Sequence, residues 1–300
     1  MLHRLTLKLL FSAVALRPGW LVRHRDALAA IAWFGSGYLR RVCKSNGRWV
    51  LGPDADDAAL ARYGRSVVCE FLRFVGDLAQ ARVMDPAQML GRVADIEGRD
   101  HFEAALQMER GLIIATCHVG NFEVGAVAVA ERVPETHILF QSDEDSGFDR
   151  MRSELHRRLR LTEARVEGGL ETWMQLRDAL CRGAAVLIQA DRCMPGQPGT
   201  PTPFLHGHMQ MPDGPAKLAQ ITGAPILPIA CSVQPDGRVL LHIDRPIGPS
   251  EADPHPDKDS IRHRLAAFFS GIIARQPGQW HTLQRAFIEN QHELKDPAPS

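Results

Sequence analysis

From about residue 101 onward, short apolar runs alternate with stretches of helical pattern, and this alternation limits the possible folds more than any other feature of the chain. The apolar runs have the length and composition of buried strands, and they lie at 111–117, 136–141 and 184–189. Helices are predicted between and after them, over 148–160, 170–182 and 257–275. Chains that alternate in this way form parallel sheets covered by helices. The sequence therefore predicts an α/β fold with a mostly parallel sheet sandwiched by helices.

Weaker signals complete this outline. A helix is predicted over 54–82, where apolar residues recur every three or four positions. Residues 161–167 predict a further strand, and a loop rich in proline and glycine is expected over 192–213. A short helical pattern over 214–223 ends in glycine, as helices often do. Pro-Asp-Gly at 235–237 lies between two apolar runs and predicts a hairpin.

Composition excludes some classes of protein. The chain has 300 residues, 45% of them hydrophobic, which is enough for the core of one large domain, with or without a helical extension. The 35 basic and 35 acidic residues balance, which argues against a general nucleic-acid-binding protein. The six cysteines are scattered without a Cys-x2-Cys or Cys/His metal-ligand spacing, which indicates a reducing compartment and no metal site.

The N-terminal 42 residues differ from the rest of the chain. They contain two apolar patches, at 5–16 and 27–34, and both are shorter than the roughly 20 residues that span a bilayer. Basic and aromatic residues flank the patches: Arg17, Trp20, Arg23, Arg25, Trp33, Arg40 and Arg41. This combination is typical of amphipathic helices that lie on a membrane. We therefore predict a membrane-associating helical segment over 1–42 and a second domain over 43–300, with a helical flap packed on that domain as the alternative.

The most informative short stretch is Cys-His-Val-Gly-Asn-Phe-Glu at 117–123, at the end of the first predicted strand. Chemistry in α/β sheets gathers at the carboxyl ends of strands. There, His118 can take a proton from a hydroxyl near neutral pH, especially when a carboxylate holds its second ring nitrogen. Glu123 is the nearest acid in the sequence. Gly120 can supply the turn that brings Glu123 back to His118, with Asn121 capping the following helix.

A second acid competes for this role. Asp191 follows the apolar run at 184–189, so it is expected at the same edge of the sheet as His118. The neighbouring Arg192 has the chemistry to bind a phosphate or a carboxylate. The residues leave open which acid contacts His118. They also leave open that His118 is only a hydrogen-bonded histidine at a strand end and Glu123 a solvated residue, because a lone His-x4-Glu spacing is common by chance.

Longer blocks in one fixed order carry a family resemblance. They are a glycine, an apolar strand and His-x-Gly-Asn-x-Glu within 96–126, an acid-bearing strand end and loop at 187–207, Leu-Ala-x-x-Thr-Gly-Ala within 214–229, and a Gln-Trp segment within 275–287. Together they cover most of residues 40–290. In this arrangement the chain resembles the bacterial lipid A biosynthesis acyltransferases, or late acyltransferases, of the lysophospholipid acyltransferase superfamily.

The resemblance implies an apolar groove for an acyl chain. It also implies transfer of that chain from an acyl carrier protein or acyl-CoA thioester to a hydroxyl, or an amine, of a lipid A precursor or another glycolipid. By resemblance His118 is the general base and Glu123 the acid of the His-x4-Glu motif. Asp191 is a further catalytic candidate, and Gly120, Asn121 and Arg192 are predicted to bind substrate. No metal, cofactor or covalent acyl-enzyme is implied, because the thioester co-substrate is already activated. The expected location is the cytoplasmic face of a bacterial inner membrane. Departures from the family pattern, such as Ala-Asp-Arg-Cys at 190–193, leave the identity of the acceptor open.

Two further features bear on function. The helix predicted over 148–160 is strongly basic, so Arg157 and Arg158 are predicted to bind an acidic carrier protein or substrate phosphates, with a solvated helix face as the alternative. His206 and His208 have no third ligand near in sequence, so no metal site is predicted there. The rival functions are a non-catalytic lipid or acyl-carrier binding protein on the same fold, and a hydrolase. The hydrolase is the weaker rival because no Gly-x-Ser-x-Gly nucleophile motif occurs.

Overall fold

The computed structural model describes residues 18–108, 110–141, 147–193, 197–248 and 256–291. Its centre is a seven-stranded sheet in the order β1-β9-β8-β2-β5-β3-β4. These strands are β1 (Val93–Glu97), β2 (Leu112–Thr116), β3 (Thr136–Phe140), β4 (Thr162–Arg165), β5 (Ala185–Gln189), β8 (Ile226–Val233) and β9 (Val239–Ile243). Only the β8–β9 hairpin is antiparallel. The predicted α/β fold with a mostly parallel sheet is confirmed.

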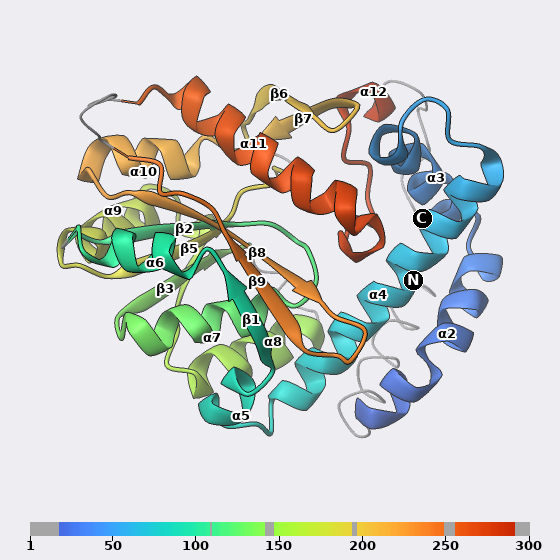
Figure 1. Cartoon of the computed structure of the whole chain (residues 1–300), viewed down its shortest axis with the longest axis horizontal. Helices are drawn as coiled ribbons and strands as arrows, with labels where there is room; N and C mark the ends of the chain where they lie inside the picture. The colour runs from blue at the N-terminus through green and yellow to red at the C-terminus, as the bar shows by residue number, and fades with distance from the viewer. Residues whose placement is uncertain (1–17, 109, 142–146, 194–196, 249–255, 292–300) are drawn as a thin grey trace.

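Helices cover both faces of this sheet (Figure 1). One face packs against α6 (Arg99–Leu106), α7 (Phe122–Arg132) and α8 (Gly147–Arg158), and the other against α9 (Gly169–Cys181), α10 (Gly214–Thr222) and α11 (Lys258–Arg275). The apolar core divides in the same way, because successive strand residues point to opposite faces. Ile114 belongs to the cluster on the α7 side, and its neighbour Ile113 belongs to the cluster on the α10 side.

The remaining described elements lie at the ends of the chain and around the sheet. They are α2 (Pro18–Gly35), α3 (Gly37–Leu51), α4 (Asp57–Ala81), α5 (Pro86–Leu90), α12 (Ile288–Gln291), the short 3-10 turns η1 (Val166–Gly168) and η2 (Pro277–Gln279), and a two-stranded hairpin, β6 (Thr200–Phe204) and β7 (Gly207–Met211). The long helix α4 matches the helix predicted over 54–82 and begins with Asp56 as its N-cap.

Two parts of the sheet structure were not predicted. The edge strand β1 carries Asp95 and Glu97 and is only partly buried, so it lacks the apolar run of a central strand. The β6–β7 hairpin lies inside 192–213, where the prediction of a loop without strands is wrong. Pro201 and Pro203 in β6 argue against a strand, but proline is tolerated on an edge that does not need its missing N–H.

The N-terminal helix α2 packs along α4 (Figure 1). The prediction that Trp33 is a membrane anchor is wrong, because its ring lies against Gly64 of α4 and is only 3% exposed. The opposite face of α2 is open to solvent, with Trp20 46%, Ile31 68% and Phe34 70% exposed. Arg17 and the first apolar patch lie outside the described residues. None of the described helices combines the length and apolar character needed to cross a bilayer.

Candidate active site

The loop between β2 and α7 carries His118 at the carboxyl edge of the sheet. Gly120 provides the predicted turn, with φ of 59°, and a side chain there would collide with the Cys231 carbonyl oxygen. Two backbone hydrogen bonds tie the loop to a C-terminal segment, from Gly120 N to Gln279 O at 3.0 Å and from His281 N to His118 O at 2.8 Å. The position of His118 is therefore fixed by residues about 160 positions away in the sequence.

The imidazole of His118 is held by Asp191. Its Nδ1 lies 2.7 Å from Asp191 Oδ1, and the other carboxylate oxygen accepts a hydrogen bond from Trp280 Nε1 at 2.8 Å. The two residues meet because β2 and β5 are parallel neighbours with Thr116 opposite Gln189, so both chains leave the sheet at the same level. An Nδ1–H donated to Asp191 leaves Nε2 of His118 with a free lone pair, as a general base requires.

Glu123 lies elsewhere. Its carboxylate is 2% exposed and pairs with Nε2 of His156 at 3.1 Å, and Nδ1 of His156 lies 2.8 Å from Glu163. The expectation that Gly120 turns Glu123 back onto His118 is wrong, because α7 begins at Phe122 and its first turn directs Glu123 toward α8. Burial alone would lower the pKa of His156, but the two carboxylates raise it to about 9. Glu123 therefore joins α7 to α8 through a charged histidine.

The charges around His118 favour a neutral imidazole beside an ionised carboxylate. Burial lowers the pKa of His118 below its usual value, and the positive charge of Arg192 lowers it further, while Asp191 opposes both. Burial would raise the pKa of Asp191, but the charge and hydrogen bond of His118, with Arg192 and Trp280, hold it well below its usual range. A neutral His118 with its Nδ1–H fixed on an anion is the state that accepts a proton from a substrate hydroxyl.

Arg192 lies beside this pair, whereas Arg157 and Arg158 do not. One Nη atom of Arg192 donates to His281 O at 3.0 Å, and its Nε is buried without a protein partner. Arg157 and Arg158 end α8 just before β4 begins. They therefore lie near the amino ends of the parallel strands, whereas His118 lies at the carboxyl ends. Arg158 donates to Met84 O at 3.4 Å. The structure therefore brings one of the three predicted substrate-binding arginines to the site.

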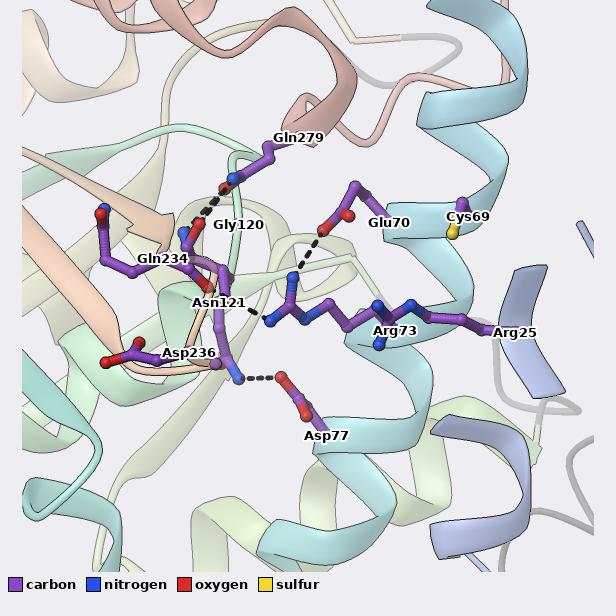
Figure 2. A network of polar contacts seen from close by, with 12 residues as sticks. Arg25, Cys69, Glu70, Arg73, Asp77, Gly120, Asn121, Gln234, Asp236 and Gln279 are labelled. Atoms are coloured by element: carbon purple, nitrogen blue, oxygen red, sulfur yellow. Dashed lines mark hydrogen bonds and ion pairs between the residues drawn. The ribbon is translucent and has the colours of Figure 1, made fainter. Parts of the chain in front are cut away.

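Polar contacts behind the loop hold it against α4, as Figure 2 shows. The side chain of Asn121 occupies the N-cap position of α7 but makes no capping bond; its amide donates to Asp77 at 3.2 Å instead. Asp77 also pairs with Arg92 at 2.8 Å. Gln279 bonds both backbone groups of Val233, at 2.7 and 2.8 Å. The capping bond predicted for Asn121 is therefore absent, and its side chain instead holds the loop against α4.

A cavity of about 600 Å³ opens beside His118, between α9 and α10. His118, Arg152 and Arg192 line its polar part. The other walls are mainly apolar and include Phe140, Val166, Trp173, Ile188 and Leu218. The guanidinium of Arg152 lies 4.3 Å from the centre of the Phe140 ring. A base beside a largely apolar cavity is the arrangement needed to present one end of an acyl chain to a reaction.

Sequence reasoning missed Trp280, His281 and His156 as parts of this site. In the sequence, the Gln-Trp segment contributed only to the family resemblance, because a contact with Asp191 or His118 cannot be predicted between residues that lie about 90 and 160 positions apart. Burial lowers the pKa of His281 to about 4, although the hydrogen bond to Gly120 acts in the opposite direction. His281 is therefore neutral, and its Nε2 donates to Gly120 O at 2.8 Å. Among the described residues, no group of three His, Cys, Asp or Glu side chains is placed to hold a metal ion.

Comparison with known proteins agrees with these features. The model of the bacterial lipid A biosynthesis acyltransferase family matches residues 25–289. The phosphatidylinositol mannoside acyltransferase of Mycolicibacterium smegmatis is 28% identical over 288 residues, covering 90% of this chain and 89% of that protein. The phosphatidylinositol mannoside acyltransferase of Mycobacterium tuberculosis is 29% identical over 243 residues, covering 79% of this chain and 72% of its own length. Because the family model spans the whole sheet and every residue of the His118 site, the chain belongs to the bacterial lipid A biosynthesis acyltransferase family.

Proposed function

We propose that this acyltransferase moves a fatty acyl group from a thioester, carried by coenzyme A or by an acyl carrier protein, to a sugar hydroxyl of a glycolipid. The observation that carries this proposal is the 2.7 Å contact between His118 Nδ1 and Asp191 Oδ1, with His118 lining a largely apolar cavity. This contact supplies a base of fixed tautomer, and the apolar lining of the neighbouring cavity suits an acyl chain.

In the proposed reaction, Nε2 of His118 takes the proton of the acceptor hydroxyl as its oxygen attacks the thioester carbon. The carbon–oxygen bond forms and the carbonyl oxygen becomes an oxyanion. Collapse of this intermediate breaks the carbon–sulfur bond, and the leaving thiolate takes the proton from His118. Asp191 stabilises the imidazolium while it exists. No metal or cofactor is needed, because the thioester is already activated.

Arg192 is the proposed electrostatic partner of the oxyanion. It lines the cavity with His118, and its buried Nε has no protein acceptor. A fixed guanidinium in a site shielded from water stabilises developing negative charge more strongly than the same group in solvent. Asp191, next to Arg192, keeps the site near neutrality before the reaction starts. Replacing Arg192 should therefore lower kcat more than it raises KM for the donor.

The proposed class of acceptor is inferred from the names of the relatives and of the family. Two are named phosphatidylinositol mannoside acyltransferases, and the family is named for lipid A biosynthesis. What these lipids share is a sugar hydroxyl on a phosphate-bearing lipid, and we assign that class to the acceptor here. The test offers purified protein palmitoyl-CoA or palmitoyl-acyl carrier protein, together with a mannosylated phosphoinositide or a lipid A precursor. Thiol release and the mass of the acylated lipid are then measured.

Transfer to one of these acceptors, lost in His118→Ala, supports the proposal. The rival on the same fold, a non-catalytic lipid or acyl-carrier binding protein, predicts thioester binding without thiol release in any combination. The tightly held His118–Asp191 pair favours catalysis, since a binding protein gains nothing from fixing the tautomer of a histidine. A protein that binds the donor but never releases thiol would favour the rival.

Membrane contact through α2 is part of the proposal, on the cytoplasmic face of an inner membrane. Trp20, Ile31, Phe34 and Tyr38 recur at helical spacing on the solvent side of α2 and the start of α3, and each is 46–70% exposed. Arg23 and Arg41 are exposed nearby, as on helices that bind anionic lipid surfaces. Sedimentation with vesicles containing phosphatidylglycerol tests this. The double variant Ile31→Glu with Phe34→Glu should no longer sediment with the vesicles. Ile221→Glu, on another helix, is the matched control and should bind like wild type. Equal binding by the wild type, the double variant and the control would contradict the contact.

A further inference from the structure

Trp173 on α9 contacts Gly214 on α10, and both residues line the apolar cavity. It lies one turn into α9, and its ring rests on the first residue of α10, where a Cβ added to Gly214 would be 2.7 Å from Cη2 of the indole. The large side chain of Trp173 therefore packs on a glycine, and this contact joins α9 and α10 where both helices line the cavity.

Gly214 is glycine because of this contact. Its φ is not in the left-handed region, so its backbone conformation is open to other residues. What a side chain at 214 would meet is the indole, at 2.7, 3.4 and 3.6 Å from three of its ring atoms. The pair is thus matched in size, and a change in either partner moves the wall that they form together.

The cavity has lining residues on both sides of this wall. His118, Gln189 and Arg192 line the cavity where β2 and β5 end. Arg177 and Ile221 also line it, further along α9 and α10 than Trp173 and Gly214. With a rise of about 1.5 Å per residue, Arg177 is about 6 Å beyond Trp173 and Ile221 is about 10 Å beyond Gly214. The space beyond the indole is open at the surface, since Ile221 is 68% exposed.

We propose that Trp173, seated on Gly214, sets the longest acyl chain that this enzyme uses efficiently. This inference rests on the proposed function, in which the cavity holds the acyl chain of the donor. A chain attached at His118 runs along the cavity until it meets the indole. Longer chains must either displace the ring from Gly214 or leave methylene groups in water, and both are unfavourable.

The experiment compares kcat/KM for saturated acyl-CoA donors from octanoyl to eicosanoyl. In Trp173→Ala the preferred length should increase, by about fourfold in the ratio of long to short donors for each newly buried methylene. In Gly214→Ala the added methyl pushes the indole into the cavity, so the preferred length should decrease. The control Gln175→Ala, on the exposed side of α9 and outside the cavity, should keep the wild-type profile.

The two opposite shifts separate a length-setting wall from a residue that only stabilises the fold. If Trp173→Ala lowers kcat/KM by the same factor for every donor, or leaves the preferred length unchanged, the proposal is refuted. Should Trp173→Ala not fold, Trp173→Leu and Gly214→Ala carry the same test in opposite directions. The rise in melting temperature produced by each acyl-CoA gives a second profile that needs no turnover. A length limit that shifts in this binding profile, in a protein that transfers no acyl group, would refute the proposed function and leave Trp173 as the limit of a lipid-binding cavity.

Discussion

Replacing Asp191 by asparagine keeps the shape of the side chain but removes its charge and one acceptor. The two oxygens of Asp191 accept from His118 Nδ1 and from Trp280 Nε1. The indole N–H can only donate, so the single oxygen of asparagine should pair with Trp280. The asparagine NH2 group then faces His118 and favours the tautomer with its proton on Nε2. That tautomer cannot act as the base.

The lost charge alone has a large expected effect. With the centres of the carboxylate and the imidazolium about 4 Å apart, an effective dielectric constant of about 20 gives an attraction of about 4 kcal/mol. Each 1.36 kcal/mol of transition-state stabilisation is a factor of about ten, so kcat should fall by about 10³. The wrong tautomer adds to this loss. KM for the donor should change little, because Asp191 is fully buried and lies outside the lining of the cavity.

Steady-state thiol release with one acyl-CoA donor and a saturating acceptor measures this effect. Glu123→Gln is the matched control, because it also neutralises a buried carboxylate next to a histidine, but that histidine is His156. We expect it to lower the melting temperature while kcat stays within about tenfold of wild type, since the His118–Asp191 pair is kept. A folded Asp191→Asn protein with near-normal kcat, or a Glu123→Gln protein that loses turnover without losing stability, would refute this reasoning.

Three further outcomes follow from the same contacts. His118→Ala should lower kcat at least about 10²-fold with an unchanged melting temperature, and near-normal turnover in a folded variant would exclude it as the base. Because burial lowers the pKa of His118 and the base must be neutral, kcat/KM should stay constant as pH falls through 6.5 and be lost only at lower pH; a loss centred above 6.5 would contradict this. The pKa of His156 is raised to about 9, so its contribution to stability should be complete below about 6.5 and be lost as pH rises through 9. Melting temperatures of wild type and His156→Gln between pH 6 and 10 should therefore converge at high pH, and parallel curves would contradict the assignment.

The contact made by Glu123 shows that the two ends of the His-x4-Glu motif have different positions and partners. His118 faces the cavity and Asp191, whereas Glu123, five residues later, faces α8. Through His156 it holds the helix that also carries Arg152, which lines the cavity beside His118. The two ends of the motif thus fix two different elements of one site.

Local sequence determined most of the architecture. The apolar runs that became β2, β3 and β5, and the periodic patterns of α4 and α11, were predictable because strand and helix periodicity are properties of neighbouring residues. The same reasoning placed His118 and Asp191 at one edge of the sheet, since parallel strands share the direction of their carboxyl ends. It missed β6 because its prolines give a loop signal.

Only the tertiary structure decided how the site is completed. The family motif and the turn at Gly120 favoured Glu123 as the partner of His118. Instead, the pairing of β2 with β5 brought Asp191 to 2.7 Å, and the first turn of α7 directed Glu123 away. Trp280 reaches Asp191 from a segment 89 positions further along the chain. Such contacts depend on the register between strands and on how distant segments pack. Neither is a property of any short stretch of sequence, so the sequence identified the histidine and the fold selected its carboxylate.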